Sequence, residues 1–123
     1  MNEELERRAR SFVYAWRGVA ALLRTQSNAR IHAAATLGVL LLGAVLGVPR
    51  TGWAVLVLAI ALVWSAEAVN TAFEFLCDRV SPEFHPLVER AKDVAAGAVL
   101  LAAAGAAVAG LLILGPPLWS RIF

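Results

Sequence analysis

The stretch EAVNTAFEFLCD, residues 67–78, places acidic and amide side chains inside and just after a long apolar run. Asn70, Glu74 and Asp78 follow Glu67 at offsets that, at about 100° per residue, bring all four side chains to one face of a helix. A charged side chain at membrane depth costs roughly 2.5–3.5 kcal/mol on insertion scales, so such groups normally face a bundle interior or an aqueous site. This polar stripe is therefore the first place to look for function.

The composition around the polar stripe is that of a membrane protein. The chain has 123 residues, of which 60% are hydrophobic and 16% charged, and its mean hydropathy is +0.72. Three apolar stretches reach or approach the ~18–20 residues that cross a bilayer. We therefore expect an all-α membrane protein with a single domain over residues 1–123. Its expected elements are a surface helix at 1–28 and transmembrane helices at 31–48, 52–77 and 87–114. Three spans leave much surface uncovered, which favours a homo-oligomer.

The N-terminal segment alternates apolar and basic residues at helical spacing. Phe12, Val13 and Trp16 fall on one side, whereas Arg10 and Arg17 fall on the other. This pattern predicts an amphipathic helix in the membrane surface, and the alternative is an ordinary helix that packs on nothing. No cleavable leader is expected, because no short apolar core follows the charged first ten residues.

The basic residues predict an orientation. Six arginines precede residue 31, and Arg79, Arg90 and Lys92 lie between the second and third spans, whereas Arg50 and Arg121 stand alone at the opposite ends. The positive-inside rule then places the N-terminus and the polar stripe's open end in the cytoplasm. The net charge of +2 is small and spread along the boundaries, so nucleic-acid binding is not expected.

Two carboxylates of the stripe are spaced for two separate tasks. Glu67 and Glu74 lie two turns apart, about 10–11 Å along a helix axis, which is too far to share one proton or one small metal ion. We expect a base that activates a lipid hydroxyl and a ligand for Mg²⁺ near a nucleotide. Lys92 would bind phosphate, and Asp93 would orient Lys92 or an arginine. The alternative is a buried salt-bridge network that fixes helix register. No glycine-rich phosphate loop is present, so a nucleotide site must be built from helix faces.

Several motifs together resemble one family. They are EAVNTAFE at 67–74, Asp78, HPL at 85–87, AKD at 91–93 and AAGAV at 95–99, with WRG at 16–18 near the start. This set resembles the bacterial integral-membrane diacylglycerol kinase and undecaprenol kinase family over nearly the whole chain. The resemblance implies a homotrimer in the bacterial inner membrane that uses MgATP to phosphorylate a lipid alcohol at the cytoplasmic face.

The resemblance also implies roles for individual residues. Glu67 matches the proposed general base, Asn70 a polar residue that organises the site, and Glu74 a ligand of metal and nucleotide. The residues that match nucleotide-binding positions are Lys92 and Asp93 for the phosphates, Glu83 to His85 in the loop before the third span, and Arg7, Tyr14 and Arg17 in the surface helix.

One position departs from the family pattern. Where the family commonly has a second metal-binding Glu before the first span, this chain reads Thr25-Gln26. A Gln carbonyl oxygen can coordinate Mg²⁺ but supplies no charge, so weaker metal affinity or a replacement ligand is expected.

The HPL and AAGAV motifs look more like the undecaprenol kinases of Gram-positive bacteria, with diacylglycerol as the alternative substrate. Two functions of other classes stay open, namely a small proton-coupled transporter and a silent scaffold that keeps the kinase fold.

Overall fold

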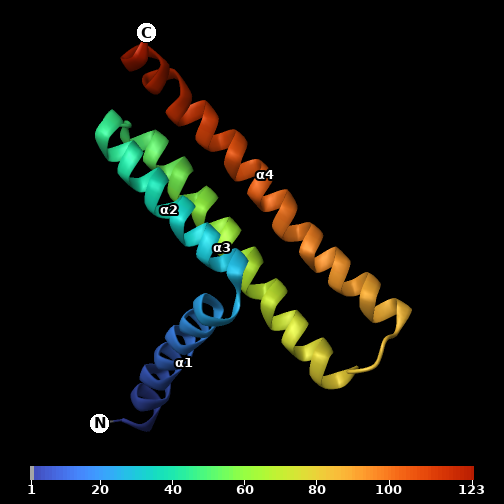
Figure 1. The fold of residues 1–123 in the computed structure, drawn as a ribbon. Helices are drawn as coiled ribbons and strands as arrows, with labels where there is room; N and C mark the ends of the chain where they lie inside the picture. The colour runs from blue at the N-terminus through green and yellow to red at the C-terminus, as the bar shows by residue number, and fades with distance from the viewer. Residues whose placement is uncertain (1) are drawn as a thin grey trace.

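The computed structural model describes residues 2–123, which form four helices (Figure 1). In chain order they are α1 (Glu3–Thr25), α2 (Ser27–Leu46), α3 (Arg50–Val80) and α4 (Pro86–Ile122). Helices α2, α3 and α4 are each long and apolar enough to cross a membrane. The predicted all-α fold with three candidate spans is thus confirmed.

Local sequence explains where the helices begin and end. Gly47 ends α2 with a φ of +67°, a left-handed conformation that glycine adopts without steric cost, and Pro49 then caps the start of α3. Pro86 opens α4, and the Nδ1 atom of His85 accepts a hydrogen bond from the Leu87 N–H at 3.1 Å. Gln26 has an extended backbone, and this single residue separates α1 from α2.

The three long helices lie side by side, whereas α1 diverges from them (Figure 1). Helices α3 and α4 run antiparallel and share the most extensive contact, and α2 packs along both. α4 continues through Pro116 and Pro117 to Ile122, past residue 114, where the predicted span ends. The subunit is therefore a bundle of three long helices, α2 to α4, from which the fourth helix, α1, diverges.

Packing within the subunit is tightest at the end that carries the α2–α3 turn. Leu46, Val48, Leu56 and Leu114 form a small buried cluster there. A Cβ atom added at Gly43 would lie 2.8 Å from Cη2 of Trp53, so this glycine lets α3 approach α2 closely.

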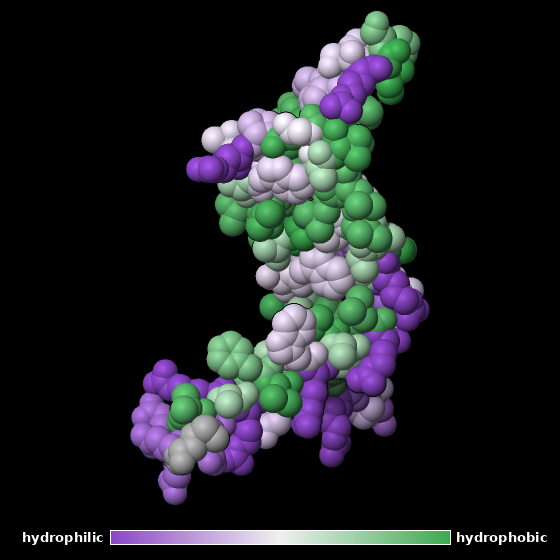
Figure 2. Space-filling model, turned by 90° about the vertical axis from the view of Figure 1, so that its left-hand side faces the viewer, coloured by the Kyte–Doolittle hydropathy of each residue, from purple (hydrophilic) through white to green (hydrophobic). Residues whose placement is uncertain are grey.

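Most large apolar side chains point outward instead. Figure 2 shows a hydrophobic band between two more hydrophilic ends. In each candidate span only 11–22% of the most hydropathic window is buried inside the subunit. Exposure of so much apolar surface to water is unfavourable, so lipid or other subunits must cover it.

Candidate active site

The polar stripe lies on α3 and becomes more exposed along the helix. Glu67 is 2% exposed and Asn70 is 9% exposed, whereas Glu74 is half-buried and Asp78 is exposed. The stripe therefore turns its first part toward the other helices, as its spacing predicts, and its last part toward the end that carries the loop before α4.

Three neighbouring polar atoms of the stripe are buried without partners. Within residues 2–123, Oε2 of Glu67, Oδ1 of Asn70 and Oγ1 of Thr71 accept or donate no hydrogen bond. Buried polar groups are normally satisfied, and leaving one unpaired costs about 1–3 kcal/mol. Three such atoms lie within residues 67–71, which makes this part of α3 the strongest candidate for contact with a ligand or another subunit.

A histidine from α2 approaches the buried carboxylate. Nε2 of His32 lies 3.7 Å from Oε2 of Glu67, and the His32 side chain is 20% exposed. The sequence interpretation missed His32, although a signal was available. A titratable side chain inside an expected span is the same kind of signal that singled out Glu67.

Glu67 and Asn70 line a recess of about 310 Å³ between α2, α3 and α4. His32 and Asn28 contribute from α2, and α4 contributes the apolar side chains of Ala96, Val99, Leu100 and Ala103. We call this space the carboxylate recess. All its polar side chains come from α2 and α3, whereas α4 lines it with apolar side chains alone.

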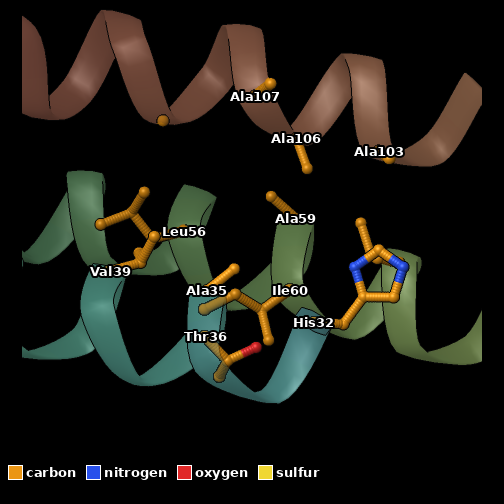
Figure 3. Close-up of a pocket in the computed structure, with 12 residues that line it drawn as sticks. His32, Ala35, Thr36, Val39, Leu56, Ala59, Ile60, Ala103, Ala106 and Ala107 are labelled. Carbon is orange, nitrogen blue, oxygen red and sulfur yellow. The ribbon is translucent and has the colours of Figure 1, made fainter. Parts of the chain in front are cut away.

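A second, apolar groove of about 200 Å³ adjoins the carboxylate recess (Figure 3). His32 and Ala103 line both spaces. Figure 3 shows His32 at one end of the groove and Leu56 with Val39 at the other. The apolar groove and the carboxylate recess therefore lie next to each other.

The predicted phosphate-binding lysine lies at the exposed end of the stripe. Nζ of Lys92 donates a hydrogen bond to Oδ1 of Asp78 at 3.1 Å, which ties α4 to α3. The sequence predicts that Asp93 orients Lys92 or an arginine, whereas the carboxylate paired with Lys92 is that of Asp78. Asp93 is exposed and forms no ion pair among residues 2–123.

The other predicted nucleotide contacts do not line the recess in this subunit. Arg7 and Tyr14 line a surface hollow on α1, and the Arg17 guanidinium lies 5.7 Å from the Tyr14 ring centroid. Glu83 is exposed in the loop, where its carbonyl accepts a hydrogen bond from the Ser81 hydroxyl. His85 is exposed and caps α4.

The two residues predicted to hold Mg²⁺, Glu74 and Gln26, each carry a side-chain oxygen that can coordinate it. No group of three His, Cys, Asp or Glu side chains within residues 2–123 could hold a metal ion by itself. Glu74 offers one half-buried carboxylate, and Nε2 of Gln26 donates to Oγ1 of Thr25, which leaves its carbonyl oxygen free to coordinate. Mg²⁺ is usually held by one or two carboxylates plus substrate phosphates, so this donor set suits it.

Comparisons with known proteins identify the family of this chain. The family model described as prokaryotic diacylglycerol kinase matches residues 13–114. An undecaprenol kinase from Bacillus subtilis is 41% identical over 117 residues, which cover 95% of each chain. A diacylglycerol kinase from Synechocystis is 44% identical over 111 residues, 89% of this chain and 63% of that one.

A diacylglycerol kinase from Escherichia coli is 31% identical over 108 residues, 88% of this chain and 85% of that one. The polar stripe, the Lys92–Asp78 pair and the carboxylate recess all lie within the matched residues 13–114. The chain therefore belongs to the prokaryotic diacylglycerol kinase family of membrane lipid kinases.

Proposed function

We propose that this protein transfers the γ-phosphate of ATP to the hydroxyl of a membrane lipid alcohol, with undecaprenol preferred over diacylglycerol. The observation that carries this proposal is the buried Glu67 carboxylate, whose Oε2 has no hydrogen-bond partner and which faces the carboxylate recess. An alcohol seated there would donate its hydrogen bond to Glu67.

Glu67 then acts as the general base. It accepts the hydroxyl proton while the alcohol oxygen forms its bond to the γ-phosphorus and ADP leaves. Asn70 lies one turn further along the same face, with an amide oxygen that also lacks a partner. This amide orients the alcohol relative to the incoming phosphate. Apolar side chains of α4 line the recess and would contact the apolar part of the alcohol.

The nucleotide binds at the exposed end of the stripe. Lys92 and Asp93 bind its phosphates, and Glu83 to His85 contact it from the adjacent loop. Glu74 and Gln26 would hold Mg²⁺, which, when bound, neutralises charge on the phosphate oxygens. The two-turn separation of Glu67 from Glu74 supports this division of tasks.

The enzyme works as a homotrimer in the bacterial inner membrane, with its active site at the cytoplasmic face. One observation supports an oligomer: the spans leave most of their apolar surface uncovered within the subunit. In the trimer, α1 lies on the membrane surface. Its exposed Phe12, Val13 and Trp16 support that placement.

Undecaprenol is favoured as substrate because the B. subtilis relative with that named activity aligns over 95% of both chains. Diacylglycerol is the alternative, supported by the relatives from Synechocystis and E. coli.

The decisive experiment measures transfer of labelled γ-phosphate from MgATP to undecaprenol and to diacylglycerol, side by side in mixed micelles. Glu67→Gln should reduce transfer by about 10²–10⁴-fold, the usual contribution of a general base. Glu89→Gln, an exposed acid of α4 outside the recess, is the matched control and should retain activity.

The other outcomes separate the alternatives. Transfer to diacylglycerol alone would replace the preferred substrate. No transfer to either lipid at high Mg²⁺ would contradict the kinase proposal and favour a scaffold. Proton-dependent flux in liposomes without ATP consumption would favour a transporter.

A further inference from the structure

A hydrogen bond between two side chains joins α2 to α3 inside the candidate membrane spans. Nε1 of Trp64 on α3 donates to Oγ1 of Thr36 on α2 at 3.0 Å, and both side chains are half-buried. Among residues 2–123, no other hydrogen bond between side chains joins these two helices. This bond is therefore their main directional contact.

The bond lies next to the contact between His32 and Glu67. His32 precedes Thr36 by four residues on α2, and Glu67 follows Trp64 by three residues on α3. Side chains at these spacings are neighbours on one face of a helix. Figure 3 shows His32 and Thr36 on successive turns of α2. The hydrogen bond and the contact at the active site therefore follow each other along the same pair of helices.

The contact between His32 and Glu67 cannot fix its own geometry. Its length of 3.7 Å exceeds that of a hydrogen bond, and the nearby groove-lining side chains of α2, Ala35 and Val39, are apolar. In a membrane, apolar contacts between helices have little advantage over apolar contacts with lipid. A rotation of α2 by one residue, about 100°, would turn His32 away from Glu67. A directional contact nearby is needed to prevent that rotation.

We propose that the hydrogen bond from Trp64 to Thr36 sets the register of α2 on α3 and so keeps His32 beside Glu67. Trp64 and Thr36 are then positioning residues, which act on the reaction through His32 and Glu67. A side-chain hydrogen bond between membrane helices changes an equilibrium by about threefold on average, which biases the pair toward one register. The consequence for catalysis rests on the kinase function proposed above, in which Glu67 is the general base.

The first test follows the imidazole nitrogens of His32 by NMR in detergent micelles and needs no turnover. The chain has two histidines, and the His32 signals are those absent in His32→Gln. Glu67→Gln should shift these signals, because the carboxylate lies beside the ring. Thr36→Val keeps the branched shape of the side chain and removes its hydroxyl. In that background Glu67→Gln should cause a much smaller shift.

Two variants control this measurement. Thr36→Ser keeps the hydroxyl and should preserve the effect of Glu67→Gln on the His32 signals. Thr51→Val makes the same change as Thr36→Val at an exposed position of α3 and should preserve it as well. The four tryptophans also give separate indole N–H signals. Thr36→Val should move the indole signal that Trp64→Phe removes, because that N–H loses its acceptor.

Steady-state kinetics test the consequence for catalysis. Thr36→Val should lower kcat for a polyprenol by about threefold to tenfold, with KM for the lipid and for MgATP unchanged. The losses in Thr36→Val and His32→Ala should not add, because both variants remove the same positioned imidazole. Thr36→Ser should retain most of kcat, and Thr51→Val should behave as wild type.

The outcomes separate this proposal from the kinase function. An undiminished effect of Glu67→Gln on the His32 signals in Thr36→Val would overturn the positioning role, and so would losses in kcat that add fully. A higher KM for the lipid with unchanged kcat would instead make Thr36 a substrate contact. Absence of phosphorylation by the wild type would overturn the kinase function, whereas the NMR comparison would still decide whether the hydrogen bond positions His32.

Discussion

The imidazole of His32 and the carboxylate of Glu67 face each other between α2 and α3, with Nε2 3.7 Å from Oε2. This separation is longer than a hydrogen bond, which leaves Oε2 free to accept one from a substrate. It is short enough that His32 limits where the Glu67 carboxylate can point. We therefore predict that His32 acts as a positioning residue for Glu67.

The first prediction concerns this contact. His32→Ala should lower kcat by roughly tenfold or more, because a carboxylate without a polar neighbour samples unproductive orientations. His32→Gln should retain more activity, since its amide can still donate toward Glu67. Steady-state kinetics should show the loss in kcat with KM for MgATP unchanged. Equal activity in the Gln and Ala variants would mean that His32 only fills space.

The second prediction concerns Gln26 at the break between α1 and α2. Gln26→Glu should lower the Mg²⁺ concentration needed for half-maximal activity, because a carboxylate adds charge to the donor set. Ser27→Glu adds the same charge at the next, exposed position and should not lower it. A titration of activity with Mg²⁺ measures both. If Gln26→Glu changes neither the Mg²⁺ requirement nor turnover, position 26 does not bind the metal.

The third prediction separates two roles of Lys92. Its partner Asp78 has a side chain that is 68% exposed, and exposed ion pairs contribute little to stability. Asp78→Asn should therefore leave Tm nearly unchanged and KM for MgATP similar. Lys92→Met should raise KM for MgATP by on the order of tenfold, because it removes a charge-assisted contact to phosphate. If Asp78→Asn and Lys92→Met raise KM for MgATP equally, the role of Lys92 is its ion pair with Asp78 and not a contact with phosphate.

The fourth prediction tests the close approach of α2 to α3. Gly43→Ala should destabilise the protein by about 1–3 kcal/mol, because the new methyl group overlaps the Trp53 indole. Gly38→Ala is the control on the same helix, where an added Cβ meets nothing within 4 Å. That variant should be neutral or stabilising. Thermal unfolding in detergent, followed by tryptophan fluorescence, compares the two, and equal Tm values would contradict the packing at Gly43.

Local signals made much of the fold predictable. Apolar length predicted the three candidate spans, and Pro86 predicted the start of α4, because these features act within a few residues of chain. The spacing of Glu67 and Asn70 predicted that both would share one face, and both are buried. Contacts between residues of different helices could not be predicted in this way. The approach of His32 to Glu67 and the pairing of Lys92 with Asp78 join residues far apart in sequence, so periodicity within one helix could not reveal them.

The uninterrupted course of α3 fixes the distance between the two carboxylates that it carries, Glu67 and Glu74. After Gly52 this helix contains neither glycine nor proline up to Val80, so it has none of the usual causes of a bend. The separation of Glu67 and Glu74 along the helix axis is consequently fixed at about 10–11 Å. Any adjustment that brings a nucleotide closer to a lipid must therefore come from other elements. Because α1 is joined to the three long helices through the single extended residue Gln26, we expect α1 to make it.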